Sequence, residues 1–267
     1  MADNIKVGFI GCGNMGGALA RAAAKSGYMP MLADLNGDMA NKLASEIGGT
    51  VSTNEAIAAE CDYIFLAVKP QVMEKVLNSV ADILCKRENA VLVSMAAGLD
   101  TSTLRKFAGS CPCPIIRIMP NTPASIGEGV ILYCVDGATD SQVETFCSIM
   151  CKAGMLDSIP ERLIDAGSAL SGCGPAFVFE FIEALADGAV DCGLPRDKAL
   201  AYAIHTVIGS AKLAKASGEH PYALRDRVCS PGGSTIEGVK ALADGGFNSA
   251  CMQAVIAAYK RTLELGK

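Results

Sequence analysis

The sequence is poor in histidine and in basic clusters. Its 267 residues include two histidines and no tryptophan, and the formal net charge is -5. Without a basic stripe there is no electrostatic reason to expect binding to nucleic acid. Cys111-Pro112-Cys113 and the pair Cys147 and Cys151 contain ligand-type residues. Because histidines are few and no second cysteine pair has zinc-finger spacing, we expect no metal.

A basic-then-apolar leader is also missing. Residues 1–4 lead directly into apolar residues, and we find no later apolar run long enough to cross a bilayer. We therefore expect a cytoplasmic protein without membrane contacts. Its 12 cysteines lie mostly within apolar stretches. We interpret them as reduced thiols that pack as small apolar residues, since disulfide frameworks belong to small secreted domains.

The chain does contain a glycine-rich turn directly after an apolar strand. Residues 5–16 read Ile-Lys-Val-Gly-Phe-Ile-Gly-Cys-Gly-Asn-Met-Gly. Gly11 permits a tight turn, Gly13 lets the backbone approach a pyrophosphate, and Gly16 lets the following helix pack closely. The anion would sit at that helix N-terminus. Asp34 ends the next strand, at the position of a partner for a ribose 2′-hydroxyl, so the pattern predicts a dinucleotide-binding site.

Strands and helices alternate over the first half of the chain. We predict strands at 5–10, 30–34, 63–68, 90–95, 114–119 and 130–134, and helices at 15–26, 37–47, 71–84, 101–107 and 141–152. This alternation is typical of an α/β domain with a doubly wound parallel sheet of the Rossmann type. We assign residues 1–162 to it. Ligands of such domains bind at the carboxyl ends of the strands near the switch point.

From Leu163 onward the sequence shows helical periods and no convincing strand. We predict an all-helical second domain over residues 163–267. Its stretches at 176–192, 199–216 and 251–265 are apolar around more than one face, which is excessive for surface helices. We therefore expect them to pack against a second copy, so that this domain makes a homodimer.

Three predicted strand ends, at residues 67–70, 95–98 and 119–123, are further candidates for cofactor contacts. Proline and glycine also end strands without any ligand, and this interpretation stays open for each. The complete predicted set of cofactor-binding residues is Ile10, Gly11, Cys12, Gly13, Asn14, Met15, Asp34, Asn54, Ala67, Val68, Lys69, Pro70, Met95, Ala96, Ala97 and Asn121. An acid at position 34 repels a 2′-phosphate, so we expect NADH to be used at least as well as NADPH.

A second glycine pair, in Ser230-Pro231-Gly232-Gly233-Ser234-Thr235, precedes a predicted helix that contains Ile236, Val239 and Leu242. The free N–H groups at the start of this helix would make an anion cradle. Serine or threonine before an apolar run also serves as a simple helix N-cap, and that alternative stays open.

Together these motifs resemble the pyrroline-5-carboxylate reductases. The resemblance rests on residues 10–16, 67–70, 119–123, 170–176 and 228–235, in this order along the chain. It implies that NADH or NADPH delivers hydride to the cyclic imine Δ1-pyrroline-5-carboxylate, giving L-proline in the last step of proline biosynthesis. Members of that family also form rings of dimers.

The resemblance also implies roles for single residues. The substrate-binding residues would be Glu161, Ser230, Gly232, Gly233, Ser234 and Thr235. Thr235 would be the catalytic contact to the imine nitrogen. For Glu161, a carboxylate that favours the iminium form and a solvated surface side chain remain equal alternatives.

Two other classes of function stay open from the residues alone. A β-hydroxyacid dehydrogenase shares the two-domain plan, but it needs a lysine early in the second domain. This chain has no lysine or arginine between Arg162 and Arg196, which argues against that class. A non-catalytic dinucleotide-binding regulator would not need the second anion site. We interpret His205 as a core residue and His220 as a residue that orders its loop.

Overall fold

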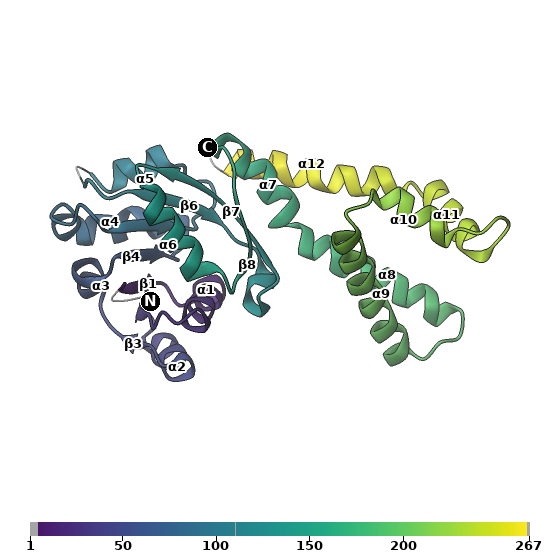
Figure 1. Cartoon of the computed structure of the whole chain (residues 1–267), viewed down its shortest axis with the longest axis horizontal. Helices are drawn as coiled ribbons and strands as arrows, with labels where there is room; N and C mark the ends of the chain where they lie inside the picture. The colour runs from purple at the N-terminus through teal and green to yellow at the C-terminus, as the bar shows by residue number, and fades with distance from the viewer. Residues whose placement is uncertain (1–4, 110, 266–267) are drawn as a thin grey trace. The chain divides into compact units, whose positions relative to one another are not determined.

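The computed structural model describes residues 5–109 and 111–265 (Figure 1). The chain divides into two compact units. The first, which we call the sheet unit, comprises Met1–Cys173 with Ala258–Lys267, and the second, the helical unit, comprises Gly174–Ala257. The domain boundary that we placed at residue 162 stays a prediction.

One eight-stranded sheet forms the centre of the sheet unit, in the order β3-β2-β1-β4-β5-β6-β7-β8. Its strands are β1 (Val7–Ile10), β2 (Met31–Ala33), β3 (Thr50–Val51), β4 (Tyr63–Leu66), β5 (Val91–Ser94), β6 (Ile115–Met119), β7 (Gly129–Asp136) and β8 (Gly154–Ser158). The first six are parallel, and the order in which strands are added to the sheet reverses beside β1, which pairs with both β2 and β4. The predicted doubly wound α/β fold is thus confirmed.

The sheet departs from the predicted strands at three places. The two-residue strand β3 and the edge strand β8 were not predicted. In addition, β7 runs antiparallel to β6, with Arg117 opposite Cys134. Only a short connection with the 3-10 turn η1 (Thr122–Ile126) joins these two strands. A parallel return would need a longer crossover, usually a helix, so the chain turns back instead.

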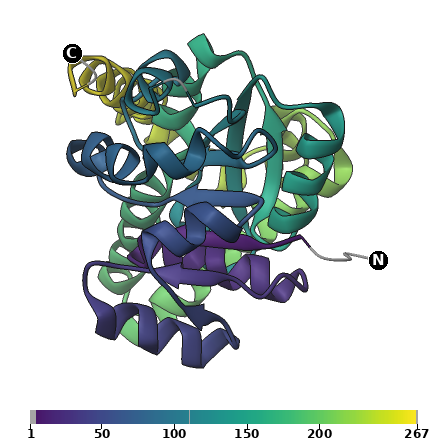
Figure 2. The same cartoon turned by 90° about the vertical axis from the view of Figure 1, so that its left-hand side faces the viewer.

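Helices cover both faces of this sheet (Figures 1 and 2). Residues of α1 (Asn14–Lys25), α2 (Gly37–Ile47) and α6 (Asp140–Met150) share one apolar cluster with the strands. Residues of α3 (Asn54–Glu60), α4 (Pro70–Leu84) and α5 (Thr101–Phe107) share the cluster on the other face. The central strands β1, β4, β5 and β6 are buried on both sides, which explains why the sequence reads there as continuous apolar runs.

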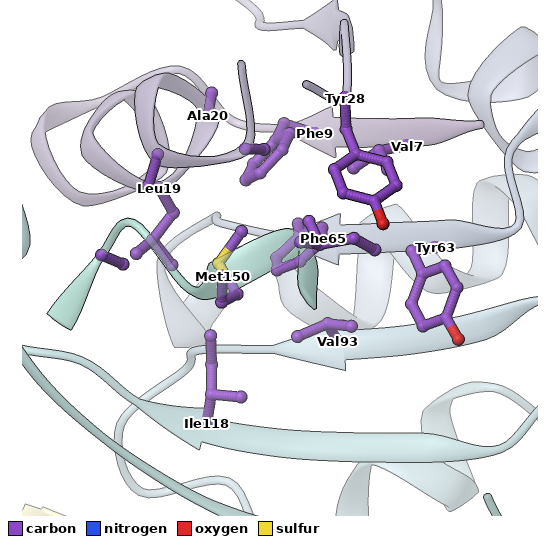
Figure 3. Packing of buried hydrophobic residues seen from close by; sticks show 14 of the residues in the cluster. Val7, Phe9, Leu19, Ala20, Tyr28, Tyr63, Phe65, Val93, Ile118 and Met150 are labelled. Carbon is purple, nitrogen blue, oxygen red and sulfur yellow. The ribbon is translucent and has the colours of Figure 1, made fainter. Parts of the chain in front are cut away.

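Aromatic rings fill the first of these clusters (Figure 3). Phe9 of β1 stacks on Phe65 of β4 with ring centroids 4.4 Å apart, and Phe65 lies 6.4 Å from Phe146 of α6. Ile64 and Leu66, the neighbours of Phe65, belong to the opposite cluster because side chains alternate along a strand. This packing holds the carboxyl ends of β1, β2 and β4 at one edge.

After β8 the chain continues in the sheet unit with the 3-10 turn η2 (Glu161–Leu163) and α7 (Ile164–Ser171). The helices that follow are α8 (Gly174–Asp191), α9 (Arg196–Ser217), α10 (Pro221–Val228), α11 (Ser234–Asp244) and α12 (Phe247–Leu265). Contrary to our expectation, one stretch, Glu161–Asp191, is long and apolar enough to span a membrane by length and composition alone. Of the 18-residue apolar window within this stretch, 11% is buried within the chain.

Candidate functional site

The glycine turn lies at the carboxyl end of β1, between the loops that follow β2 and β4. Gly11 N–H donates to the Ala33 carbonyl at 2.7 Å, and Ala67 N–H donates to the Ile10 carbonyl at 2.8 Å. These bonds continue the sheet pairing past the strand ends. The structure therefore brings the predicted residues 10–15, Asp34 and 67–70 together at the switch point, where such folds bind ligands.

The three glycines of the turn have different surroundings. Gly11 has φ +104°, and a Cβ there would come within 2.5 Å of the Ala67 carbonyl oxygen. A Cβ on Gly16 would overlap the Gly11 carbonyl oxygen, so this glycine allows α1 to pack against the turn. A Cβ on Gly13 would meet nothing within 4 Å. The open space in front of Gly13 suits a ligand that approaches the backbone.

Helix α1 starts at this open glycine. Gly13 is its N-cap and contributes no side-chain hydrogen bond to the N–H groups of the first turn. Unpaired N–H groups and the helix dipole favour an anion at such an end. A cavity of about 260 Å³ adjoins the turn and is lined by Cys12, Gly13, Asn14, Arg21, Met39, Lys42 and Leu43. Arg21 is already engaged by both carboxylate oxygens of Glu46, at 2.6 Å each.

Asp34 is fixed against the turn by two backbone groups. Its Oδ2 accepts from Cys12 N–H at 2.6 Å and its Oδ1 accepts from Asn36 N–H at 2.8 Å. Burial, and secondarily the charge of Asp34, raise the pKa of the Cys12 thiol to about 11. Cys12 is therefore a neutral thiol at pH 7. Each carboxylate oxygen of Asp34 retains a lone pair for a further donor.

The remaining predicted cofactor residues follow other strands at the same edge. Lys69 is the exposed N-cap of α4, with Pro70 at its first turn. After β5, Ala96 is buried and Ala97 is exposed. Asn54 is the first residue of α3, after the N-cap Thr53. Each of these positions borders the switch-point edge, and their contacts to a cofactor stay predictions.

Asn121, after β6, is buried and makes structural hydrogen bonds. Its Nδ2 donates to the Ser171 carbonyl at 2.9 Å, and its Oδ1 accepts from Val130 N–H at 2.8 Å. These bonds use the side-chain amide to hold the end of α7 and the start of β7. A contact of Asn121 to the cofactor would therefore use its backbone or the remaining amide hydrogen.

The predicted substrate loop, residues 230–235, belongs to the helical unit. Gly233 is the N-cap of α11 and provides no side-chain hydrogen bond. Ser234 and Thr235 are the first residues of the helix, and neither is its N-cap. The simple N-cap interpretation of these hydroxyls therefore does not apply. The half-buried Thr235 and the backbone N–H groups of the first turn are left for an anion.

Glu161 is held by partners within the sheet unit. Its Oε1 accepts from Thr101 N–H at 2.7 Å and its Oε2 accepts from the Thr101 hydroxyl at 2.9 Å. Arg117 Nη1 lies 3.3 Å from Glu161 Oε1, and Arg117 Nη2 lies 3.0 Å from Asp165 Oδ1. We did not predict the roles of Thr101, Arg117 or Asp165. Arg117, a charged residue inside the apolar run 115–119, was the one feature of the sequence that could have indicated this cluster.

The two histidines have different environments. His220 is the N-cap of α10, where its Nδ1 accepts from Tyr222 N–H at 3.3 Å. This agrees with a role in ordering the loop. His205 on α9 is exposed in the single chain, so the core position that we expected for it is wrong for the chain by itself.

Two family models match parts of the chain. Residues 161–265 match the model described as pyrroline-5-carboxylate reductase dimerisation. Residues 6–98 match the model described as NADP oxidoreductase, coenzyme F420-dependent. The first match includes the apolar stretch Glu161–Asp191.

Whole proteins and solved structures are similar over the full length. A pyrroline-5-carboxylate reductase from Arabidopsis thaliana is 39% identical, covering 100% of this chain and 97% of that protein. One from Escherichia coli is 38% identical, covering 98% of each. Pyrroline carboxylate reductase from Plasmodium falciparum with NADP bound superposes with a TM-score of 0.86 at 33% identity, covering 99% of both chains. The chain therefore belongs to the pyrroline-5-carboxylate reductase family.

Proposed function

We propose that this protein reduces Δ1-pyrroline-5-carboxylate to L-proline with NADH or NADPH, the last step of proline biosynthesis. The observation that carries the proposal is the full-length likeness to reductases of this substrate, at 39% identity over the whole chain. The N-termini of two helices also support the proposal, because the N-caps of α1 and α11 are glycines, which provide no side-chain hydrogen bond. The N-terminus of α1 suits a pyrophosphate, and that of α11 suits a carboxylate.

The sheet unit fits a nicotinamide dinucleotide, since the space in front of Gly13 is open and the α1 N-terminus lacks a side-chain cap. The residues that would hold it are Ile10, Gly11, Cys12, Gly13, Asn14, Met15, Asp34, Asn54, Ala67, Val68, Lys69, Pro70, Met95, Ala96, Ala97 and Asn121. When bound, the cofactor supplies the hydride. The role of these residues is to bind and orient it.

The charges near Asp34 favour NADH. Asp34 and Asp38 are both acidic, and no arginine occurs at residues 35–37. Two cations line the nearby cavity, Arg21, which is neutralised by Glu46, and Lys42 on α2. A 2′-hydroxyl can donate to Asp34, whereas a 2′-phosphate would meet its charge without an unengaged arginine to offset it. NADH is therefore used at least as well as NADPH.

The substrate needs little acid–base chemistry. A cyclic imine that carries a proton on nitrogen is already an electrophile, so the protein mainly has to hold its carbon in reach of the hydride. Ser230, Gly232, Gly233 and Ser234 bind the substrate carboxylate. Thr235 contacts the imine nitrogen through its hydroxyl or its backbone. Glu161 acts through the net negative charge of its cluster, in which two carboxylates, Glu161 and Asp165, face the single guanidinium of Arg117.

The helical unit joins two copies of the chain. Large apolar side chains of its helices are exposed in the single chain, among them Phe179 of α8, Leu213 of α9 and Met252 of α12. Burying such side chains is worth about 1.5–3 kcal/mol each. The assembly is a cytoplasmic homodimer that can extend to a ring of dimers. Light scattering of the purified protein measures this, and a monomer at micromolar concentration would contradict it.

The deciding assay follows the absorbance of NADH and NADPH with and without Δ1-pyrroline-5-carboxylate. We expect imine-dependent oxidation of the cofactor, and only weak oxidation of L-proline in reverse, because the imine is the less stable partner. Turnover of a 2- or 3-hydroxy acid without imine reduction would support the dehydrogenase class. Cofactor binding without turnover of either substrate would support a regulator.

A further inference from the structure

Arg117 is a buried cation in the middle of the sheet. Its side chain is 3% exposed, and its strand neighbours are Ser94 on β5 and Cys134 on β7. Burying a guanidinium is costly unless it is paired. Arg117 is paired twice, with Glu161 of η2 through Nη1 and with Asp165 of α7 through Nη2. Both partners lie in the segment that follows β8 along the chain.

Neutralising the charge of Arg117 would require only one carboxylate. Two carboxylates face one guanidinium, and the buried Arg117 Nε has no hydrogen-bond partner among the described residues. A well-packed apolar cluster is often as stable as a buried ion pair of this kind. A planar, two-pronged guanidinium does, however, fix the direction of its partners in a way that apolar contacts do not.

The segment that Arg117 holds is attached to the same strand a second time. Asn121, two residues past the end of β6, donates from Nδ2 to the carbonyl of Ser171, the last residue of α7. The helix α7 is therefore pinned near both ends by residues of β6 and its extension. Asn121 is also one of the proposed cofactor contacts. Its orientation at the end of β6 therefore depends on where α7 lies.

We propose that Arg117 is a positioning residue of the reductase, which holds α7 against β6 through Glu161 and Asp165 and so fixes the strand end at Asn121. Arg117 itself touches neither ligand. A small shift of α7 would move the Ser171 carbonyl and reorient Asn121, whereas the glycine turn would still bind the pyrophosphate. Hydride transfer depends steeply on such geometry. The inference rests on the proposed imine reduction.

The test uses three full-length variants. Arg117→Lys keeps the charge but loses the two-pronged contact. The double variant Arg117→Met with Asp165→Asn removes one charge of each sign, so the net charge of the cluster is unchanged, and the Glu161 carboxylate that remains keeps its two hydrogen bonds from Thr101. Arg105→Lys is the matched control, because Arg105 also makes an ion pair, with Asp136 at 2.6 Å, and does not contact α7.

We expect kcat for imine reduction to fall roughly tenfold or more in Arg117→Lys and in the double variant, with the Kd for NADH within about twofold of wild type. Amide hydrogen exchange over residues 164–171 of the cofactor-free protein should become faster in both. The Arg105→Lys control should show neither change. A purely structural role predicts a lower Tm with normal kcat in the folded fraction.

Four results would overturn the proposal: wild-type kcat in Arg117→Lys, unchanged exchange over α7, an equal loss of kcat in the control, or a loss that appears as weaker NADH binding. Failure of the proposed function is distinguishable, because the wild-type protein would then show no imine reduction at all. The exchange measurement would still report whether Arg117 holds α7.

Discussion

The carboxylate of Asp34 accepts a hydrogen bond from the backbone N–H of Cys12, 2.6 Å away, and this bond joins the end of β2 to the glycine turn. It places the acid beside the backbone that would hold a pyrophosphate. Asp34 therefore has two effects in the proposed site. It orients the turn, and it presents negative charge where the 2′ position of the adenosine ribose is expected.

Replacing Asp34 by serine should shift the cofactor preference toward NADPH. The serine hydroxyl removes the charge that repels a 2′-phosphate and still accepts a hydrogen bond. We expect the ratio of kcat/KM for NADH over NADPH to fall roughly tenfold or more, equivalent to about 1.4 kcal/mol. Asp38→Ser is the matched control, with a smaller shift. A wild-type enzyme that strongly prefers NADPH would show that Asp34 does not face the ribose.

Substitution by alanine should weaken NADH binding at one glycine of the turn and lower the stability of the protein at another. A methyl group on Gly13 meets nothing within 4 Å, so Gly13→Ala should cost less than about 1 kcal/mol of stability and yet weaken NADH binding. A methyl group on Gly16 would overlap the Gly11 carbonyl, so Gly16→Ala should lower the Tm of the cofactor-free protein. Calorimetry and NADH titration measure both effects. If Gly13→Ala binds NADH normally, the cofactor does not approach this glycine.

The sheet and its glycine turn were predictable because their signals are local. The apolar runs of β1, β4 and β5 are buried on both faces, and the motif at residues 11–16 specifies its own turn. By contrast, β3 has two residues, both exposed, and β8 ends in Asp157 and Ser158. Such edge strands lack an apolar run. They are recognised only by their backbone pairing with a neighbouring strand, which the sequence does not show.

Parts of the site were not predictable because they depend on distant partners. Arg117 stands out in an apolar run, but its partners are 44 and 48 residues away and nothing local specifies them. The pair Gly232 and Gly233 is another example. Gly232 has φ +67°, whereas Gly233 has φ -82° and ψ 168°, an extended conformation that any residue adopts. The sequence does not indicate which of the two the backbone requires.

Acid should weaken the start of α5 through Asp100. This N-cap accepts from Thr103 N–H at 2.7 Å and from the Ser102 hydroxyl at 3.0 Å. Hydrogen bonds from Thr103, and then the other donors, hold the pKa of Asp100 below its ordinary value. The ionised form therefore stabilises the fold fully above the unfolded pKa of about 3.9, and this contribution is lost as the pH falls through the lower folded pKa.

Asparagine at this position keeps the cap but does not titrate. We expect the free energy of unfolding of the wild type to fall more steeply than that of Asp100→Asn between about pH 5 and pH 2. Urea unfolding at several pH values measures the two slopes. Parallel slopes would contradict the role of the Asp100 charge, while Asp100→Ala should lose about 1 kcal/mol at neutral pH as well.

Thr235 provides the most direct test of the proposed substrate contacts. Its helix α11 starts at Gly233 without a side-chain cap, so the Thr235 hydroxyl is not needed as an N-cap. Thr235→Val keeps the shape and removes the hydroxyl. We expect kcat/KM for the imine to fall roughly tenfold to a hundredfold, about 1.4 to 3 kcal/mol, with unchanged NADH affinity and Tm.

Thr235→Ser is the matched control, because it keeps the hydroxyl. We expect this variant to retain most of the wild-type activity. A purely structural hydroxyl would give the opposite pattern, with a lower Tm, normal kinetics in the folded fraction and no difference between substrate and cofactor. Titrating both ligands against the folded Thr235→Val protein separates these cases. Unchanged imine kinetics would leave only the backbone N–H groups of α11 to hold the substrate, because the hydroxyl would then make no contact to it.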